Sequence, residues 1–177
     1  MPALRHWFEY FPGNHMWSQG MMFAIEMQTY GASAISEVDQ VGQRLAGHEG
    51  DNERWWTEWT AMAQRIEAMV AAAQADGHEL TAGSYWLRAA VYYFCGERFL
   101  SPGPRKESTY RDCLRCFQKG IARRYPTIER VEVPFENGTT LPAWFYRSPV
   151  ASTTRCRPAP RSTTFRPGRR STRRVSR

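Results

Sequence analysis

The segment from Tyr85 to Phe94 constrains the fold of this chain most, because nine of its ten residues are apolar or aromatic and only Arg88 is charged. A helix made of this segment has no polar face. Such a helix is stable in water only when other elements surround it. We therefore expect a central helix, opened by Thr81 or Ser84, with several further helices packed around it.

Two segments near the start of the chain carry helical patterns. Residues 14–30 are rich in Met and aromatic residues, which would lie on several sides of a helix packed from more than one direction. Residues 35–45 have apolar side chains three and four positions apart, as on one face of a helix. Ser33 or Ser36 is the expected cap of this second helix.

A longer helix is expected between Asp51 and Gly77. The Asp51 carboxylate can accept hydrogen bonds from the first free backbone N–H groups, and Gly77 can take the left-handed conformation that ends a helix. The apolar stripe of this helix comprises Trp55, Trp59, Met62, Ile66, Met69 and Ala73. A fifth helix, 104–124, is expected after the break at Ser101-Pro102-Gly103-Pro104. Its apolar side comprises Tyr110, Leu114, Phe117 and Ile121.

After Pro126 the spacing of apolar residues changes from about 3.6 to 2, which indicates strands. Asn137-Gly138 lies between the two strand-like runs and can adopt the positive φ angles of a tight hairpin turn. The apolar residues of these runs are Ile128, Val131, Val133, Phe135, Leu141, Trp144 and Tyr146. A two-stranded hairpin is rarely stable alone, so this one must pack on the helices or belong to a larger sheet.

These patterns predict a mainly α fold, in which a bundle of about five helices is followed by one β-hairpin. We expect a helical domain at 1–126, the hairpin at 127–148 and a disordered tail rich in Arg, Ser, Thr and Pro at 149–177. Residues 151–177 contain nine Arg and no acidic residue, whereas residues 1–150 hold 15 basic and 17 acidic residues. The positive charge of the chain therefore belongs to its tail.

Nucleic-acid binding is the function that such a charge first suggests, since Arg neutralises phosphate. The tail has only Phe165 as an aromatic residue, so it lacks the stacking side chains of a single-strand binder. We expect no specific nucleic-acid partner. No apolar run approaches the ~18 residues of a membrane span, and no signal peptide is recognisable, so we expect no membrane contact and a cytoplasmic location.

Cys113 and Cys116 have the spacing of metal ligands or of a redox pair, but a second pair or suitable His ligands are missing. Ordinary reduced thiols are the alternative, and they fit a cytoplasmic chain better. The four histidines are widely separated and form no His-x-x-x-His spacing. We expect no metal site and no cofactor.

An aromatic cluster at helical spacing favours a hydrophobic core over a ligand-stacking site. Its members are Trp55, Trp56, Trp59, Tyr85, Trp86, Tyr92 and Tyr93. A polar tip on a buried helix needs a partner, and a ligand can supply one. Tyr92, Tyr93 and Glu97 are therefore the candidates for a substrate pocket.

Several short motifs occur in an order typical of one protein family. They are Phe11-Pro-Gly-Asn, Glu37-Val-Asp-Gln-Val-Gly-Gln-Arg-Leu, Gly50-Asp, Trp55-Trp, Trp59, Gly77-His, Ser84-Tyr-Trp-Leu-Arg-Ala-Ala-Val-Tyr-Tyr-Phe, Glu97-Arg-Phe-Leu, Glu129-Arg-Val-Glu-Val-Pro-Phe and Thr140-Leu-Pro. Over about residues 6–148 the chain resembles the N-terminal part of the α/β hydrolases that include pseudo-oxynicotine hydrolase, fungal polyketide-shortening hydrolases and fermentation-respiration switch esterases.

The resemblance implies that the helical region is a cap covering an α/β-hydrolase domain whose sheet begins with the hairpin. It also implies hydrolysis of an ester or of a ketone carbon–carbon bond of a small carbonyl substrate. The family's catalytic Ser, on a Gly-x-Ser-x-Gly turn, and its acid and His lie beyond the hairpin. Gly31-Ala-Ser33-Ala-Ile is the nearest match, but it ends in Ile and follows no strand, so we expect no catalytic residue in this chain.

The tail differs from the family where a buried strand should begin, and its composition is that of a GC-rich coding sequence read out of frame. We therefore expect a truncated, frameshifted chain that is inactive alone. A freestanding helical interaction module with a basic tail is the alternative interpretation. Whether the chain forms a homodimer is left open by the sequence.

Overall fold

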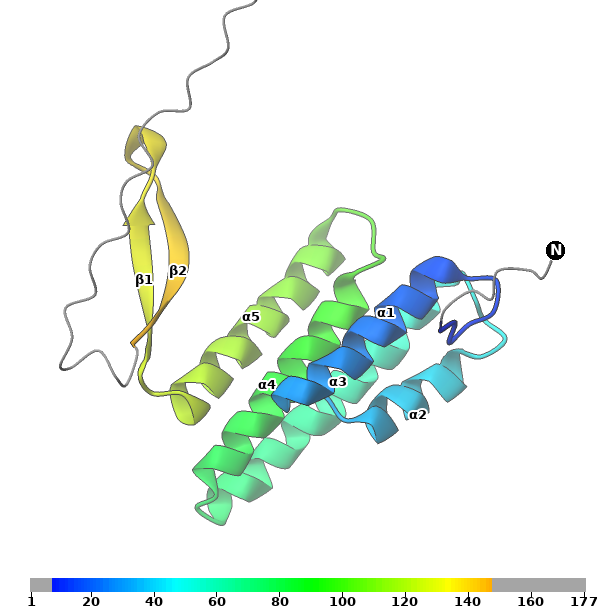
Figure 1. The fold of residues 1–177 in the computed structure, drawn as a ribbon, viewed down its shortest axis with the longest axis horizontal. Helices are drawn as coiled ribbons and strands as arrows, with labels where there is room; N and C mark the ends of the chain where they lie inside the picture. The colour runs from blue at the N-terminus through cyan, green and yellow to red at the C-terminus, as the bar shows by residue number, and fades with distance from the viewer. Residues whose placement is uncertain (1–7, 148–177) are drawn as a thin grey trace, which may run out of the picture. The chain divides into compact units, whose positions relative to one another are not determined.

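The computed structural model describes residues 8–147, and the predicted tail at 149–177 lies outside them. In the described part, five α-helices precede two strands (Figure 1). The elements are α1 His15–Glu26, the 3₁₀ turn η1 Met27–Tyr30, α2 Ile35–Leu45, α3 Asn52–Ala75, α4 Glu79–Glu97, α5 Pro104–Arg124, β1 Ile128–Pro134, the turn η2 Glu136–Gly138 and β2 Thr140–Tyr146. The predicted mainly α fold with one hairpin is therefore confirmed. Contacts between residues separate the chain into two units, Met1–Phe145 and Tyr146–Arg177.

Helix α4 is the central helix of the bundle, as its apolar sequence predicts. It lies between α3 and α5 and also contacts α1, while α2 packs against α3 (Figure 1). Aromatic rings fill the space between these helices: ring centroids lie 4.9 Å apart for Trp17 and Trp55, 5.7 Å for Trp55 and Trp59, and 5.6 Å for Trp59 and Tyr92. Most of the predicted aromatic cluster is thus core, although Trp56 and Tyr85 are only half-buried.

Small residues let the helices approach closely. A side-chain Cβ at Gly20 of α1 would lie 2.8 Å from the Trp55 ring, and one at Gly120 of α5 would lie 2.7 Å from the Leu87 side chain. Both distances are too short for real atoms, so these two positions accept only glycine at the observed packing. Gly83 of α4 also lies against α5, with a Cβ there 3.0 Å from the Arg123 side chain, so the close approach of α5 to α4 depends in part on these missing side chains.

Two of the expected helix caps form and two do not. Asp51 Oδ1 accepts a hydrogen bond from the Arg54 backbone N–H at 2.9 Å, as predicted. The prediction that Ser33 or Ser36 caps α2 is wrong, because Ala34 is the cap residue and the buried Ser33 hydroxyl donates to the Ala24 carbonyl at 2.6 Å. Gly77 takes the expected left-handed conformation, with a φ of 72°.

The start of α4 also differs from the expectation. The helix begins at Glu79 after His78, so Thr81 and Ser84 lie inside it rather than at its cap. The Ser84 hydroxyl donates to the Leu80 carbonyl at 3.0 Å, a bond that a serine makes within a helix. In α3 the buried stripe passes through Val70 and not through Met69, which is 41% exposed.

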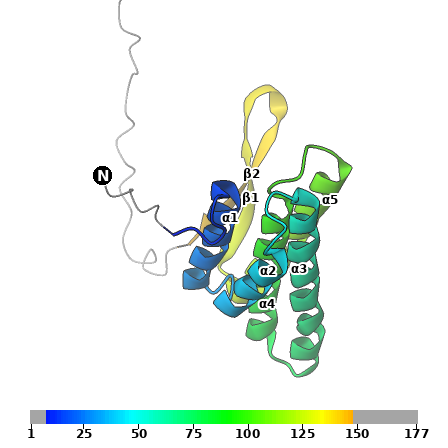
Figure 2. The same ribbon diagram turned by 90° about the vertical axis from the view of Figure 1, so that its right-hand side faces the viewer.

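The hairpin forms as predicted, with β1 and β2 paired in a two-stranded sheet. Figure 2 shows the two strands joined at one end by their turn, where Asn137 and Gly138 have φ angles of 56° and 74°. The Trp144 ring meets Phe117 of α5 edge-on, with centroids 5.4 Å apart. Most other apolar side chains of the hairpin are exposed, among them Val133, Phe135, Leu141 and Phe145.

Of the helices between residues 8 and 147, none combines the length and apolar character that a membrane crossing requires.

Candidate functional site

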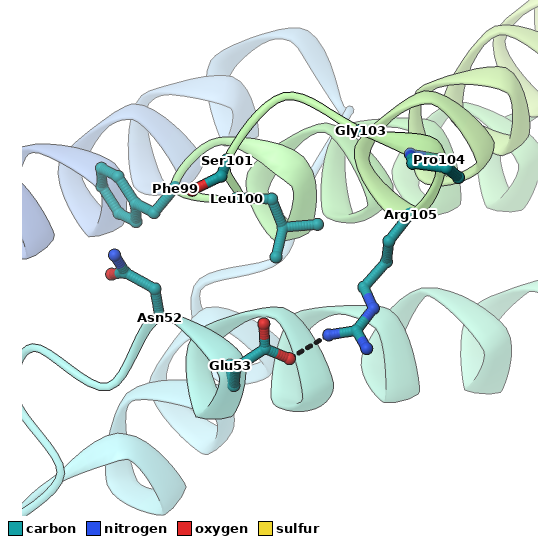
Figure 3. Close-up of a pocket in the computed structure, with 8 residues that line it drawn as sticks. All are labelled: Asn52, Glu53, Phe99, Leu100, Ser101, Gly103, Pro104 and Arg105. Atoms are coloured by element: carbon teal, nitrogen blue, oxygen red, sulfur yellow. Dashed lines mark hydrogen bonds and ion pairs between the residues drawn. The ribbon is translucent and has the colours of Figure 1, made fainter.

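Two cavities flank the segment that joins α4 to α5, and both involve the N-terminal end of α5. The Arg105 cavity has a volume of about 350 Å³ and is lined by Asn52, Glu53, Phe99, Leu100, Ser101, Gly103, Pro104 and Arg105 (Figure 3). The Lys106 cavity has a volume of about 340 Å³ and is lined by Glu97, Pro102, Gly103, Lys106, Glu107 and Tyr110. Gly103 lines both cavities, so the segment that joins α4 to α5 lies between them.

The sequence Pro102-Gly103-Pro104 explains why the chain turns at this place. Gly103 has φ 155° and ψ −179°, a backbone conformation that is essentially restricted to glycine. Pro104 occupies the first turn of α5, where the missing N–H of proline would have no helical partner. Because Gly103 is also the cap residue and offers no side chain, the first backbone N–H groups of α5 have no side-chain cap.

In the Arg105 cavity, the Arg105 side chain extends from α5 toward α3 and forms an ion pair with Glu53 (Figure 3). Its guanidinium also lies over the Trp56 ring, 4.8 Å from the ring centre. Asn52, at the first turn of α3, accepts a hydrogen bond from Trp17 Nε1 at 3.3 Å. Both polar side chains that face this space from α3 therefore already have partners.

In the Lys106 cavity, Glu97 is the last residue of α4 and is only 8% exposed. The Lys106 ammonium forms an ion pair with the Glu97 carboxylate. It also donates to the Glu97 main-chain oxygen at 2.8 Å. This double contact holds the end of α4 against the first turn of α5. The buried charge of Glu97 is thereby compensated by a cation that is itself one-third exposed, at 32% of its side chain.

Tyr92 was a candidate for the substrate pocket, and the structure places its hydroxyl between α4 and α2. The hydroxyl donates to Glu37 Oε2 at 2.6 Å and accepts from the Ala34 backbone N–H at 2.9 Å. Burial and the hydrogen bond to Glu37 raise the pKa of Tyr92 above its ordinary value. Arg88 forms an ion pair with Glu37, so this carboxylate has two partners on α4, Tyr92 and Arg88. The Tyr92 hydroxyl thus accepts the hydrogen bond of the backbone N–H at Ala34, the cap residue of α2, which makes no side-chain cap hydrogen bond.

Tyr93, the second candidate, points in another direction along α4. Its hydroxyl donates to Glu67 Oε2 of α3 at 3.1 Å, and the same carboxylate receives two hydrogen bonds from Arg115 of α5, at 2.7 and 3.0 Å. Burial raises the pKa of Tyr93, and the neighbouring Glu67 charge raises it further. Burial alone would raise the pKa of Glu67, but the Arg115 and Tyr93 contacts outweigh it and leave that pKa lowered.

The three candidate pocket residues therefore lie in three separate environments. Tyr92 contacts α2, Tyr93 contacts α3, and Glu97 alone of the three lines one of the two cavities at the α4–α5 connection. Sequence reasoning missed Gly103, Arg105, Lys106 and Tyr110. A usable signal was present, because two consecutive cations follow a Pro-Gly-Pro break and Lys106 is one of only two lysines in the chain.

The thiols between residues 8 and 147 lie where burial disfavours their ionisation. Cys95, Cys113 and Cys116 are free cysteines in the described residues. Burial raises the pKa of Cys113 to about 11 and that of Cys116 to about 12, so the reactive thiolate is disfavoured. Within residues 8–147 no group of three or more His, Cys, Asp or Glu side chains converges as a metal site.

Comparison with known proteins gives a consistent group of relatives, although no protein-family model matches the chain. The chain is 27% identical to the α/β hydrolase psoB of Aspergillus fumigatus over 72% of its own length and 29% of that protein. It is 32% identical to the hydrolase acrC of Aspergillus aculeatus, over 69% of its own length and 32% of the relative. It is 29% identical to the 20-hydroxy-prefusarin hydrolase FUS2 of Gibberella moniliformis, over 55% of its own length and 24% of that relative. The chain thus spans less than a third of the length of each of these relatives.

Proposed function

We propose that this chain, which is similar to one region of proteins named hydrolases or α/β hydrolases, is a hydrolase segment that performs no chemistry itself and covers a substrate pocket. In the complete protein, the reaction would be hydrolysis of an ester or of a ketone carbon–carbon bond in a small carbonyl compound. The name of one relative, 20-hydroxy-prefusarin hydrolase, supports a hydrolytic reaction of the complete protein.

The exposed hairpin is the observation that carries this proposal. Phe135 and Phe145 are 54% and 51% exposed, and neither strand has a second neighbour in the described residues. Two strands alone are marginally stable in water and normally need a third strand or a covering helix. The exposed apolar residues and the free strand edges support a role as the first strands of a larger sheet.

The helical body has the properties of a cap that folds on its own core. Helix α4 lies between α3 and α5, and the rings of Trp17, Trp55, Trp59 and Tyr92 are buried among α1, α3 and α4. The Ser33 hydroxyl, the nearest approach to a nucleophile motif, is 5% exposed and donates to the Ala24 carbonyl. Its role is therefore to join two backbone segments, and we propose that the catalytic serine, acid and histidine lie outside this chain.

The gene itself offers the first test. We propose that the Arg-rich tail results from a shifted reading frame, and sequencing from the codons of Trp144 through about a kilobase beyond the stop codon examines this directly. The expected result is a restored frame that encodes a Gly-x-Ser-x-Gly turn. A gene with no such frame would contradict the frameshift.

The protein encoded by the restored frame provides the functional test. We expect it to hydrolyse a p-nitrophenyl ester and to react with a fluorophosphonate at its new serine, whereas the 177-residue chain does neither. Labelling of the 177-residue chain at any serine would overturn the non-catalytic role. A partner that binds this chain equally well after deletion of 149–177 would instead favour the alternative function, a freestanding helical interaction module.

A further inference from the structure

We propose that two copies of this chain pair along the outer edge of β1, antiparallel to each other and with Val131 of each copy at the two-fold axis. The pairing joins the two hairpins into one continuous sheet. It uses the edge of β1 and leaves the edge of β2 open, so it does not rest on the proposed function.

The register of the hairpin decides which backbone groups of β1 face outward. Next to the turn, the Phe135 N–H donates to the Thr139 carbonyl at 2.8 Å. Hydrogen-bonded and non-hydrogen-bonded positions alternate along an antiparallel ladder, so the backbone groups of the even-numbered residues of both strands point away from the partner strand. Pro134 and Pro142 both lie at such outward positions, where the missing N–H of proline costs no bond within the hairpin.

The outer edge of β1 is short and bounded at both ends. The Ile128 N–H donates to the Tyr125 carbonyl at 2.9 Å, and Pro134 has no N–H. Between these ends, Arg130 and Glu132 direct their N–H and C=O groups outward. A second copy of β1 offers the same set of groups in the opposite direction. A two-fold axis therefore allows N–H···O=C bonds in both directions between Arg130 of each copy and Glu132 of the other.

The side chains select this register. Arg130 and Glu132 lie on the same face of β1 and form an ion pair at 2.6 Å, with side chains that are 48% and 43% exposed. With Val131 at the axis, Arg130 of each copy lies opposite Glu132 of the other, and the charges alternate in sign. Moving the axis to residue 130 or 132 would place Arg opposite Arg or Glu opposite Glu, which destabilises paired strands. Charges that hinder pairing with most strands thus favour one arrangement of two identical strands.

The partners that these side chains already have do not block the arrangement. Glu132 contacts Arg130 through Oε1 and accepts a hydrogen bond from the Thr140 hydroxyl through Oε2 at 3.0 Å. A carboxylate has about four acceptor positions and a guanidinium has several N–H donors, so both groups can take a further partner. The contacts across the axis are therefore added to those within each hairpin and replace none of them.

The outer edge of β2 offers no such match. Pro142 interrupts the row of outward N–H groups in the middle of this strand. The other outward residues, Thr140, Trp144 and Tyr146, carry no charge. Nothing on this edge therefore fixes a register between two identical strands.

Charge reversal tests the edge and the register together, with dimerisation of the 177-residue chain measured by sedimentation velocity over a range of concentrations at low ionic strength. Arg130→Glu places Glu opposite Glu across the axis, and Glu132→Arg places Arg opposite Arg. Each variant alone is expected to dimerise at least about tenfold more weakly than the native chain. A mixture of the two variants should dimerise more tightly than either alone, because every pair across the axis is again opposite in charge.

A matched control is the ion pair of Arg111 and Glu107 on α5, whose side chains are both 69% exposed. Arg111→Glu and Glu107→Arg change the net charge of the chain by the same amounts. Each should dimerise as the native chain does. Circular dichroism of all four variants checks that the helices remain folded.

Hydrogen exchange of the native dimer locates the interface independently. The amides of Arg130 and Glu132 should be protected at concentrations where the chain is dimeric, whereas those of Trp144 and Tyr146 should not. Protection on β2 instead of β1 would overturn the proposal. So would a native chain that stays monomeric, single variants that dimerise as strongly as the native chain, or a mixture no better than its components. None of these outcomes depends on whether the complete gene encodes a hydrolase.

Discussion

Tyr92 shows how one side chain can resemble a pocket residue in the sequence and yet belong to the core. Its hydroxyl completes a polar group between α4 and the uncapped start of α2, where it serves both the Ala34 N–H and the Glu37 carboxylate. A tyrosine on a buried helix does need a partner for its polar tip, as the sequence indicates. Which partner it finds depends on a helix that lies 55 residues away along the chain.

Removing this hydroxyl should destabilise the fold. Tyr92→Phe leaves the Ala34 N–H without its acceptor in a part-buried place, and we expect a loss of about 1–3 kcal/mol in the free energy of unfolding. Urea denaturation at neutral pH measures this value. Tyr85→Phe on the same helix is the control, because the Tyr85 hydroxyl makes no hydrogen bond among the described residues. An equal loss in the two variants would show that the hydroxyl of Tyr92 contributes nothing.

The Glu67 carboxylate should make stability dependent on pH. Its pKa is lowered in the folded chain by Arg115 and Tyr93, so its contribution is present above the pKa of an unfolded glutamate and is lost as the pH falls through the folded pKa. Glu67→Gln should therefore be less stable than the native chain at pH 7, with the difference shrinking below about pH 4. Thermal unfolding across this pH range measures the difference. A difference that stays constant with pH would show that the lowered pKa has no energetic consequence.

The elements of the fold were largely predictable because each depends on local pattern. The all-round apolar segment became α4, Asp51 became a cap, and Asn137-Gly138 became the turn of the hairpin. The errors arose where a distant element competes for a local group. Ser33 has the right position and chemistry for a cap, but the carbonyl of Ala24 takes its hydroxyl. The cavities could not be predicted, because they are defined by how α5 lies against α3 and α4.

The α4–α5 connection is the element on which both cavities depend. At φ 155° Gly103 has a conformation that alanine resists, although open space surrounds the position where a Cβ would be. We expect Gly103→Ala to cost ~1–3 kcal/mol through backbone strain alone. Chemical denaturation checks this, with Ser101→Ala on the same connection as the control. A neutral Gly103→Ala variant would indicate that the connection relaxes without strain.

At the scale of the whole molecule, an enclosed helical body is joined to a hairpin that exposes apolar side chains. Val133 of β1 and Phe135, which directly follows β1, are 45% and 54% exposed. A strand with free edges and exposed apolar residues is a site of association between chains. The purified 177-residue chain is therefore expected to associate with itself or to need a chaperone for soluble expression.

Replacing these two side chains should reduce the association without loosening the helices. We expect Val133→Thr with Phe135→Thr to lower the fraction of oligomer in sedimentation velocity, while the helical content measured by circular dichroism stays the same. Leu80→Thr is the matched control, since Leu80 is a 58% exposed apolar residue on α4 and not on the hairpin. The same reduction in the control would show that association does not depend on the hairpin.

The central claim is that the helical body folds on its own core while the hairpin lacks the sheet that would stabilise it. Native-state hydrogen exchange of the 177-residue chain, at a concentration where it is monomeric, tests this most directly. The account predicts that amides of α4 exchange only through global unfolding, whereas amides of β1 and β2 exchange orders of magnitude faster. Hairpin amides protected as strongly as those of α4 would contradict it, because the two strands would then be complete without a partner.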